Sequence, residues 1–537
     1  MLKHACITRS LGLLLAILWM LPSVASADSS DSLNRVAELL ASKRFNDKYQ
    51  AVDLLAEQGD GKARAWLDAL LNNRMFLLRK DKRVVITDKA AGEVSDATTG
   101  QSLGNLKKSA LKKITLNNRM RVQIRAALAV LDIRNPDPAK RLTAVEQMLD
   151  RPEKQHAELL KPLVGQETDA GVREAMEIVI ALAGLSSDDK AERIASVEVL
   201  DGNLHPAVRN GLQRLLKDTK DAEFASVIEQ TLKGIQAKRD FYSFIENLFF
   251  GLSLGSVLVL AAIGLAITFG VMGVINMAHG ELIMIGAYTT YVIQQLMPEY
   301  IGASVLIAIP AAFLVSALVG IAIERGVIRF LYGRPLETLL ATFGISLILQ
   351  QAVRSIFSPL NRSVETPSWM SGVLEINSAL SLTYNRLYII LFSLLVFAVL
   401  YLILKKTTLG LQVRAVSQNR QMARAMGVRS EWVDAMTFGL GSGIAGVAGV
   451  ALSQLTNVGP NLGQAYIIDS FMVVVFGGVG NLWGTLVSGM SLGVVNKFLE
   501  PWAGAVLAKI LVLIFIILFV QKWPRGLFPQ KGRAAEG

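Results

Sequence analysis

Cysteine and histidine are the scarcest chemical groups in this chain. Cys6 is the only cysteine among 537 residues, and there are only four histidines. Cys6 lies in the first 27 residues, which we expect to be removed, so the mature chain would hold no cysteine at all. Disulfides, thiol catalysis and cysteine-based zinc sites are then excluded.

Charged residues are also scarce, but only in the second part of the chain. Residues 28–240 hold 67 charged side chains in 213 positions (35 Lys/Arg and 32 Asp/Glu), whereas residues 241–537 hold 30 in 297. Soluble domains are about 25% charged, and apolar runs of about 20 residues indicate membrane spans. We therefore expect a soluble domain over 28–240 and a transmembrane domain over 241–530, followed by a tail at 531–537.

The net charge of +11 does not indicate a nucleic-acid partner. The soluble part carries only +3 of it, since 35 minus 32 is 3. Most of the remaining positive charge lies in loops beside apolar stretches, and cytoplasmic loops of membrane proteins are rich in Lys and Arg.

The first 27 residues have the pattern of a secretory signal. Lys3 and Arg9 precede the apolar stretch 11–21, and Ala25-Ser-Ala27 forms a small-x-small cleavage site. The alternative is an uncleaved anchor helix. Cleavage after Ala27 would export residues 28–240, which predicts a periplasmic domain in a bacterial cell.

Residues 28–240 show apolar positions at helical spacing in short segments that resemble one another. Arg141-Leu-Thr-Ala-Val-Glu resembles Arg193-Ile-Ala-Ser-Val-Glu, and such repeats predict a HEAT-like stack of helices. The stretch 75–104, with Arg83-Val-Val-Ile-Thr, predicts a small β-hairpin. His156 and His205 have no ligand-like neighbours, so we expect neither a metal site nor a catalytic one.

The second part is expected to be all-α, with eight to ten transmembrane helices, some of them discontinuous. The apolar stretches are 248–272, 282–297, 301–323, 337–357, 387–404, 433–455, 467–479, 483–498 and 503–521. Basic residues gather in the connectors near 325–334 and 405–429 and in the tail near 522–533, which predicts that these three regions are cytoplasmic. The connector 358–385 is poor in basic residues and is expected outside, so the number of full crossings is odd.

Polar groups within the apolar stretches are the candidates for a transport pathway, because charge inside a bilayer is costly. The first group lies in Val274-Ile-Asn-Met-Ala-His-Gly-Glu281, and the second is the glycine-rich break 476–484 preceded by an aspartate. Paired breaks indicate discontinuous helices whose backbone can line a polar path. The candidate residues are Asn276, His279, Glu281, Asp469 and Asn481. The alternative is that His279 and Glu281 bond only to each other or to a neighbouring helix.

The connector 407–428 is helical by pattern and ends at Gly427, which is well placed to terminate a helix. A passive channel does not need a structured cytoplasmic helix, whereas a permease driven by a motor must present one to its motor. The pattern therefore favours a contact surface for a motor protein.

At these two stretches the sequence resembles a known family. Val274-Ile-Asn-Met-Ala-His-Gly-Glu-Leu and Arg414-Ala-Val-Ser-Gln-Asn-Arg are similar to the LivH-type permeases of branched-chain amino-acid ABC importers, over residues 245–530. The exported extension, Val364-Glu-Thr-Pro-Ser-Trp, Val479-Gly-Asn-Leu-Trp-Gly-Thr, Asn496-Lys-Phe-Leu-Glu-Pro and the tail from Gln521 further resemble the urea-transporting permeases of that family, the UrtB group.

The resemblance implies a non-enzymatic permease subunit of the bacterial inner membrane, with its amino-terminal domain periplasmic and its carboxyl end cytoplasmic. The implied partners are a second, LivM-type permease, two cytoplasmic ATPases and a periplasmic solute-binding protein, with urea as the small neutral solute. The connector then becomes the ATPase-coupling loop, through Arg414, Asn419, Arg420, Ala423 and Gly427. The chain contains no P-loop pattern, so ATP would be used by the partners and no cofactor is expected here.

Three alternatives stay open at this point. The solute could be a branched-chain amino acid or a short amide, although scarce intramembrane charge favours a neutral solute over a zwitterion. The chain could be a channel or secondary carrier that needs no motor. It could also be a membrane-anchored receptor or scaffold whose exported domain is the working part.

Overall fold

The computed structural model describes residues 25–529, apart from 43, 59–60, 88–92, 105, 107–109 and 150–151, and side chains from residue 32 on. The chain divides into two compact units, Met1–Gln236 and Ala237–Gly537. This division lies four residues before the predicted boundary at 240/241. Cys6, most of the predicted signal and the tail 531–537 lie outside the described residues. Helix α2 begins at Ala25, before the predicted cleavage point, so the signal stays a prediction.

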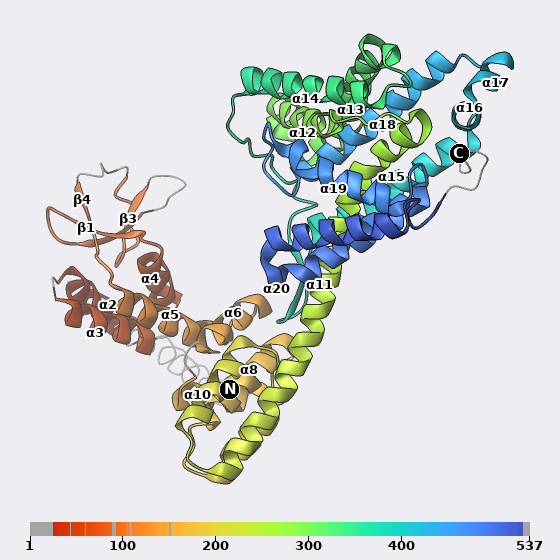
Figure 1. Cartoon of the computed structure of the whole chain (residues 1–537). Coiled ribbons are helices and arrows are strands. Elements are labelled where there is room, and N and C mark those ends of the chain that lie inside the picture. The colour runs from red at the N-terminus through yellow and green to blue at the C-terminus, as the bar shows by residue number, and fades with distance from the viewer. Residues whose placement is uncertain are drawn as a thin grey trace, which may run out of the picture. The chain divides into compact units, whose positions relative to one another are not determined.

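The amino-terminal unit is built mainly from short helices, as their apolar spacing predicted (Figure 1). They are α2 (Ala25–Ala41), α3 (Phe45–Gln58), α4 (Gly61–Leu71), α5 (Asn118–Asp132), α6 (Pro138–Leu149), α7 (Lys154–Val164), α8 (Ala170–Gly184), α9 (Lys190–Val199), α10 (Pro206–Asp218) and the start of α11 (Ala222–Met272). A HEAT-like classification of this stack stays a prediction.

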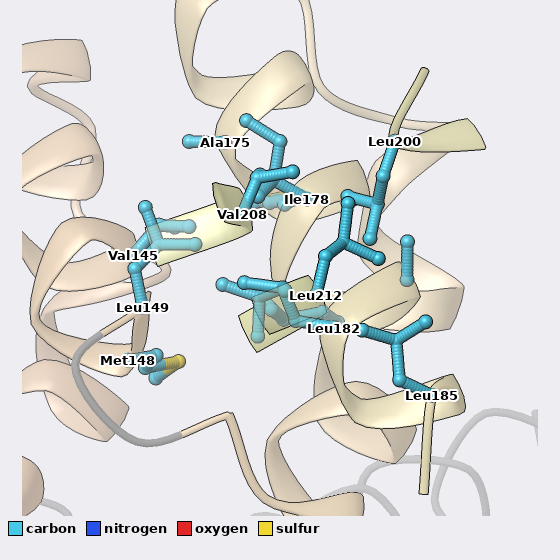
Figure 2. Packing of buried hydrophobic residues seen from close by; sticks show 14 of the residues in the cluster. Val145, Met148, Leu149, Ala175, Ile178, Leu182, Leu185, Leu200, Val208 and Leu212 are labelled. Carbon is cyan, nitrogen blue, oxygen red and sulfur yellow. The ribbon is translucent and has the colours of Figure 1, made fainter. Parts of the chain in front are cut away.

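Their cores are apolar. Figure 2 shows one of them, in which Val145, Ile178 and Leu212 point toward one another from α6, α8 and α10. Val145 and Leu212 are fully buried. Burying such a side chain contributes about 1.5–3 kcal/mol, so helices of only 10 to 15 residues are stabilised by packing rather than by their own propensity.

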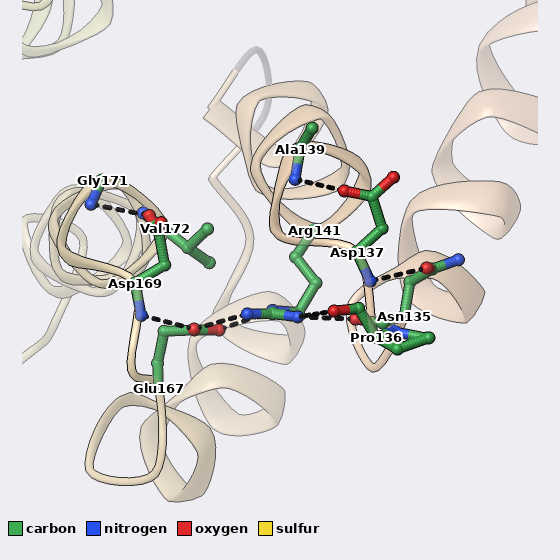
Figure 3. Close-up of polar contacts among 9 residues, drawn as sticks. All are labelled: Asn135, Pro136, Asp137, Ala139, Arg141, Glu167, Asp169, Gly171 and Val172. Carbon is green, nitrogen blue, oxygen red and sulfur yellow. Dashed lines mark hydrogen bonds and ion pairs between the residues drawn. The ribbon is translucent and has the colours of Figure 1, made fainter.

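Local polar contacts fix where these helices begin. Asp169 accepts hydrogen bonds from the backbone nitrogens of Gly171 and Val172 at the start of α8, both at 3.0 Å. The carboxylate of Glu167 accepts from Arg141 on α6 at 2.7 and 2.8 Å and from the backbone nitrogen of Asp169 at 2.9 Å (Figure 3). The hydrogen bond from the Arg141 guanidinium holds the pKa of Glu167 below its usual range. This ion pair joins α6 to the turn before α8.

The predicted β-hairpin is part of a larger sheet. Strands β2 (Val84–Thr87) and β3 (Val94–Asp96) pair antiparallel. The sheet also contains β1 (Met75–Leu78) and β4 (Leu111–Lys113), in the order β3-β2-β1-β4. Strands of three or four residues are too short to show an alternating pattern in sequence, so the predicted small hairpin was narrower than the four-stranded sheet.

Among its described residues, the membrane unit is helical apart from one two-stranded ribbon, β5 (Val373–Asn377) and β6 (Leu380–Thr383), in the predicted outer connector. The expectation of all-α structure was wrong in this detail. Its helices after α11 are α12 (His279–Leu296), α13 (Ile301–Gly326), α14 (Pro335–Phe357), α15 (Tyr384–Lys406), α16 (Thr408–Gln418), α17 (Arg420–Ala425), α18 (Ser430–Ser453), α19 (Leu462–Gly477) and α20 (Leu482–Lys522), with 3-10 turns at Pro298–Tyr300 and Ile328–Phe330.

Among the described residues, six helices are long and apolar enough to cross a membrane: α11, α13, α14, α15, α18 and α20. This is fewer than the eight to ten expected. Three of the nine apolar stretches are not counted separately, because α12 carries polar side chains, α19 has only 16 residues, and two stretches lie in α20.

Helix α20 reverses direction at Gly504, whose φ of 76° lies in the left-handed region. Before it, the Ser488 hydroxyl donates to the carbonyl of Val473 in an antiparallel arrangement with α19. After it, Lys509 contacts Asp469 and Phe515 contacts Phe476, so this arm runs parallel to α19. Counting both arms with α12 and α19 gives nine apolar segments, which is an odd number; the number of full crossings stays a prediction.

Glycines let α12 lie directly against α18, and Figure 1 shows these helices beside α13. A Cβ added to Gly286 would clash with the backbone of Gly446, and one added to Gly449 would clash with the carbonyl of Ile283. Small residues at such contacts allow the backbones of membrane helices to approach closely. Helices α12 and α18 therefore pack with their backbones in direct contact.

The basic regions of the membrane unit meet at one end of it. Arg325, at the end of α13, pairs with Glu431 at the start of α18 at 3.8 Å. The tail reaches the same end, because the side chain of Asn481 donates to the carbonyl of Phe528 at 3.2 Å. At the opposite end, the backbone nitrogen of Arg362 in the outer connector donates to the carbonyl of Val458 at 2.7 Å.

Candidate transport pathway and coupling site

The first predicted break separates α11 from α12. Helix α11 ends at Met272, Gly273 has a φ of 64°, and the chain is non-helical until α12 begins at His279. Thr342 of α14 holds this break, because its hydroxyl accepts from the backbone nitrogen of Met277 at 3.1 Å. A broken helix is tolerated at membrane depth only where its freed backbone groups find partners, and α14 supplies one here.

Glu281 is a buried acid that joins α12 to α14 through polar contacts. Its side chain comes from the first turn of α12 and is 1% exposed. One carboxylate oxygen accepts from the Ser346 hydroxyl at 2.8 Å and from the Gln350 amide nitrogen at 2.7 Å, both on α14. The other oxygen, Oε2, has no hydrogen-bond partner among the described residues. We call Glu281, Ser346 and Gln350 the polar centre.

His279 and Asn276 flank the polar centre but do not bond to Glu281. The Nε2 atom of His279 lies 2.8 Å from the carbonyl of Ala261 on α11, and Asn276 accepts from the backbone nitrogen of Ala278 at 3.0 Å. Both side chains are fully buried. His279 Nδ1 and Asn276 Nδ2 have no partners among the described residues. The two residues make hydrogen bonds at the break, and each keeps one nitrogen that could bond to a further group.

Helix α14 carries a polar stripe that sequence reasoning missed. Thr338, Thr342, Ser346 and Gln350 recur every four residues and are all buried, and Arg354 follows at the same interval. Residues four apart lie on one face of a helix. This spacing of hydroxyl and amide side chains within the apolar stretch 337–357 is the signal that could have revealed the stripe.

The second predicted break lies between α19 and α20, where Gly478 and Gly480 have φ angles of 101° and 78°. It touches the region of the first break, because a Cβ added to Gly270 would clash with the backbone of Gly480. Asn481 caps α20 by accepting from the backbone nitrogen of Gly484 at 3.2 Å. The two breaks thus meet at the end where the basic regions gather.

Asp469 forms an ion pair with a lysine and makes no hydrogen bond to the polar centre. It is 7% exposed and pairs with Lys509 of α20 at 3.1 Å. Lys509 was not singled out in the sequence, since the pairing depends on the reversal of α20. The structure therefore brings Glu281 together with α14, Asn481 with the tail and Asp469 with α20, rather than gathering all five candidates.

The connector between α15 and α18 is two helices rather than one. Helix α16 ends at Gln418, and Asn419 caps α17 by accepting from the backbone nitrogen of Met422 at 2.9 Å. Gly427, with a φ of 87°, ends α17 as predicted, and the Val428 nitrogen donates to the Ala423 carbonyl at 3.0 Å. An asparagine that caps a helix must itself be non-helical, which is why a continuous pattern breaks there.

Arg420 anchors this connector to the membrane helices. Its guanidinium forms an ion pair with Asp434 of α18, whose side chain is 1% exposed, and lies 4.1 Å from the ring centroid of Tyr332. Burial raises the pKa of the Tyr332 hydroxyl, so this ring stays neutral beneath the cation. Tyr332 lies three residues before α14. Arg420 therefore connects α17 to the amino-terminal end of α18 and to the segment just before α14.

The other coupling candidates lie on different faces of the connector. Ala423 is buried among Val413, Val416 and Val433. Arg414 is exposed and donates to the carbonyl of Leu404. The connector also exposes the large apolar side chains of Leu411, Met422 and Met426, and Trp432 is exposed in the first turn of α18.

Comparison with known proteins identifies the membrane unit. The chain is 29% identical to the high-affinity branched-chain amino acid transport system permease protein BraD of Pseudomonas aeruginosa, over 54% of this chain and 96% of that protein. It is 30% identical to the corresponding permease protein LivH of Salmonella typhimurium, over 53% and 96%. A probable permease protein LivH of Methanocaldococcus jannaschii is 26% identical, over 51% and 88%.

None of the solved structures matches the chain. The family described as branched-chain amino acid transport system / permease component matches residues 247–520, which include both helix breaks, the polar centre and the connector. The relatives are permease subunits rather than enzymes. The chain belongs to this family of ABC transporter permeases.

Proposed function

We propose that this permease forms the solute path of an ATP-driven importer and that its solute is urea. The polar centre carries the proposal. Glu281 offers a free carboxylate oxygen, and the Ser346 hydroxyl and Gln350 amide lie within 3 Å of its other oxygen. Urea presents four N–H donors and one carbonyl acceptor, so a carboxylate beside hydroxyl and amide groups matches both kinds of group. The segments that resemble urea permeases support the same solute.

A branched-chain amino acid is the second candidate. Arg354 lies one helical turn beyond Gln350 on the same face of α14, and its guanidinium donates to Asn461 at 2.8 Å. Glu281 and Arg354 would provide opposite charges for the ammonium and carboxylate of a zwitterion. The relatives named above are branched-chain amino acid permeases, which also supports this candidate.

Access to the polar centre requires α12 and α14 to separate, because Glu281, Ser346 and Gln350 are 1%, 4% and 3% exposed. The two seams of α12 differ in kind. Against α18 it makes backbone contacts through glycines, whereas against α14 it makes side-chain hydrogen bonds. The side chains between α12 and α14 can replace their mutual hydrogen bonds by hydrogen bonds to a polar solute. The glycine contacts between α12 and α18 offer no side-chain groups that could bind a solute. We therefore assign the opening movement to the α12–α14 seam.

The driving movement would enter through the connector. Two cytoplasmic ATPases would contact the exposed apolar side chains Met422, Met426 and Trp432, which are 60%, 78% and 58% exposed. Arg420 would transmit the displacement to α18 through Asp434 and to α14 through Tyr332. In this proposal a second permease completes the path, and a periplasmic binding protein delivers the solute to the end that bears the connector 358–385.

Uptake of labelled urea and labelled leucine tests the proposal in cells that lack the native gene and carry either the wild type or Gln350→Leu. Removing a hydrogen bond to a charged group costs about 1.5–3 kcal/mol. Urea uptake by Gln350→Leu should therefore fall about 10-fold to 100-fold, at equal protein in the membrane. Leu347→Ala is the matched control, because Leu347 lies on the exposed face of the same helix.

Each other outcome has a definite meaning. Leucine uptake that falls while urea uptake is unaffected would replace urea by the second candidate. Unchanged uptake of both solutes in Gln350→Leu would remove the polar centre from the path. Uptake that persists without the partner ATPases would show a channel or carrier instead of a motor-driven permease.

A further inference from the structure

A cavity of about 350 Å³ lies where the connector meets the ends of the membrane helices. Its walls come from α11, α15, α16 and the break before α20. The lining includes apolar side chains, among them Ile267, Leu404 and Leu482, and polar ones, which are Lys405 at the end of α15 and Arg414 and Ser417 on α16. The cavity is thus lined by apolar side chains together with two cations.

The two cations of this cavity are not neutralised within the described part of the chain. Lys405 donates to the Tyr401 hydroxyl at 2.9 Å, and Arg414 donates to the backbone carbonyl of Leu404. Neither forms an ion pair with a described residue, and no described residue that lines the cavity is acidic. An ammonium has three donors and a guanidinium five, so most of their hydrogen-bonding capacity is free for an anion.

Aromatic side chains place the cavity at the edge of the bilayer. The Trp483 ring is 5.8 Å from Tyr401 and 5.1 Å from Phe397, and Trp483 is 51% exposed. Tryptophan and tyrosine gather at the level of lipid headgroups. The neighbouring surface on α15 and α20 is apolar and exposed, at Val399, Leu402 and Val487. Acyl chains can cover this surface while a headgroup lies at the cavity.

We propose that the cavity binds the phosphate headgroup of an anionic phospholipid, with Lys405 and Arg414 as its cationic ligands and Ser417 and Tyr401 as neutral ones. Basic pockets between transmembrane helices on the cytoplasmic side are suited to acidic headgroups. The acyl chains distinguish a lipid from a soluble anion, because only a lipid also covers the apolar surface beside Trp483.

The site joins two elements that must act together. Lys405 belongs to the last turn of α15, and Arg414 belongs to α16 of the connector. A bound phosphate would hold the connector against α15 at the place where a motor would push. This inference concerns lipid binding alone, so it can fail or succeed independently of the proposed solute.

Quenching of Trp483 fluorescence by brominated lipid tests the site in the purified full-length chain. The protein is reconstituted in phosphatidylcholine vesicles that contain brominated phosphatidylglycerol or brominated phosphatidylcholine at equal fractions. Subtracting the signal of Trp483→Phe isolates this tryptophan from the other six. We expect brominated phosphatidylglycerol to quench the Trp483 share at least about twofold more than brominated phosphatidylcholine, since two charge-assisted contacts favour it.

The double variant Lys405→Gln/Arg414→Gln should lose that excess. The matched control Lys406→Gln/Arg429→Gln removes two exposed cations that do not line the cavity and should keep it. Equal quenching by the two lipids in the wild type, or an excess that survives in the double variant, overturns the proposal. If the double variant does not fold, competition in the wild type decides: unlabelled phosphatidylglycerol should restore the fluorescence and unlabelled phosphatidylcholine should not. Restoration by inorganic phosphate would assign the site to soluble anions and overturn the lipid.

Discussion

The two units of this chain differ in how many polar side chains they bury, although both bury apolar ones. Among the described residues, four polar or charged side chains are buried in the amino-terminal unit and 27 in the membrane unit. Large exposed apolar side chains show the reverse distribution, with four up to residue 236 and many beyond it. The solvent explains the difference. Burying apolar side chains away from water is favourable, whereas burying them away from lipid gives no comparable gain in free energy.

This contrast changes what holds the helices together. In the amino-terminal unit, apolar side chains such as Val145 and Leu212 fill the core, and ion pairs such as Arg141–Glu167 lie at its margin. In the membrane unit, helices meet through glycine contacts and through buried polar groups such as Glu281 and Asp434. The same groups that hold the membrane helices are therefore those available for transport.

The largest expected effect comes from breaking the glycine seam. Gly286→Val would place side-chain atoms against the backbone of Gly446, which cannot move aside within α18. Such overpacking costs about 3 kcal/mol, so we expect a sharp loss of the protein from washed membranes and a lower Tm after solubilisation. Gly344→Val is the control, since a Cβ there meets nothing within 4 Å. Equal amounts of the two variants would contradict the role of the seam.

Breaking the anchor of the connector should have a similar effect on stability and a specific effect on transport. Asp434→Asn leaves Arg420 without its carboxylate, and removing one partner of a buried ion pair costs about 3–5 kcal/mol. Arg420 is itself partly exposed, so we expect the lower end of this range, measured as a fall in Tm. Uptake per molecule should fall as well, because Arg420 no longer links α17 to α18.

Glu337→Gln sharpens this test. It breaks the pair with Arg334, in which both side chains are more than half exposed, and exposed pairs contribute only about 0–1 kcal/mol. A loss of stability in Glu337→Gln as large as in Asp434→Asn would show that burial is not what makes the anchor strong.

The smallest effect concerns pH in the amino-terminal unit. The pKa of Glu167 is lowered in the folded state by its hydrogen bond to Arg141. Its stabilising contribution is therefore fully present above the pKa of an unfolded glutamate, about 4.3, and is lost as pH falls through the lower folded value. Hydrogen exchange of residues 153–172 in the full chain, corrected for the intrinsic pH dependence, should stay constant from pH 7 to pH 5 and rise below pH 4.

Glu167→Gln provides the control for this titration. The variant cannot ionise, so its exchange over 153–172 should already be raised at pH 7 and should show a weaker rise in acid than the wild type. An unchanged rise would assign the acid sensitivity to other carboxylates, such as Asp169 at the start of α8.

Several local features could be predicted from the sequence because they depend on neighbouring residues. The breaks at Gly273 and at Gly478 and Gly480, and the helix end at Gly427, all have the left-handed φ angles that glycine adopts readily. The break at Asn419 was missed, because an asparagine within a helical pattern signals a cap only when the surrounding backbone is known. The strands β1 and β4 were missed because each is stabilised by its partner strands.

The contacts of the polar centre could not be predicted from neighbouring residues. Glu281 was a candidate from the sequence because it interrupts an apolar stretch, but its partners Ser346 and Gln350 lie 65 and 69 positions away. Arg420 was a candidate as a basic connector residue, yet its role depends on Asp434 and Tyr332. Asp469 was grouped with the pathway, although the reversal of α20 pairs it with Lys509.

The sequence by itself determined which solvent surrounds each part of the chain, because hydropathy and charge are properties of the residues alone. It also determined the helix breaks and ends at Gly273, Gly427, Gly478 and Gly480, since glycine readily adopts a positive φ. Only the tertiary structure decided which face of each membrane helix is buried and which polar groups meet there. In a bilayer an apolar residue is stable both in the protein interior and on the lipid-facing surface. The pattern of apolar residues therefore does not specify which helices pack together. That choice is made by close backbone contacts at glycines and by hydrogen bonds between distant helices.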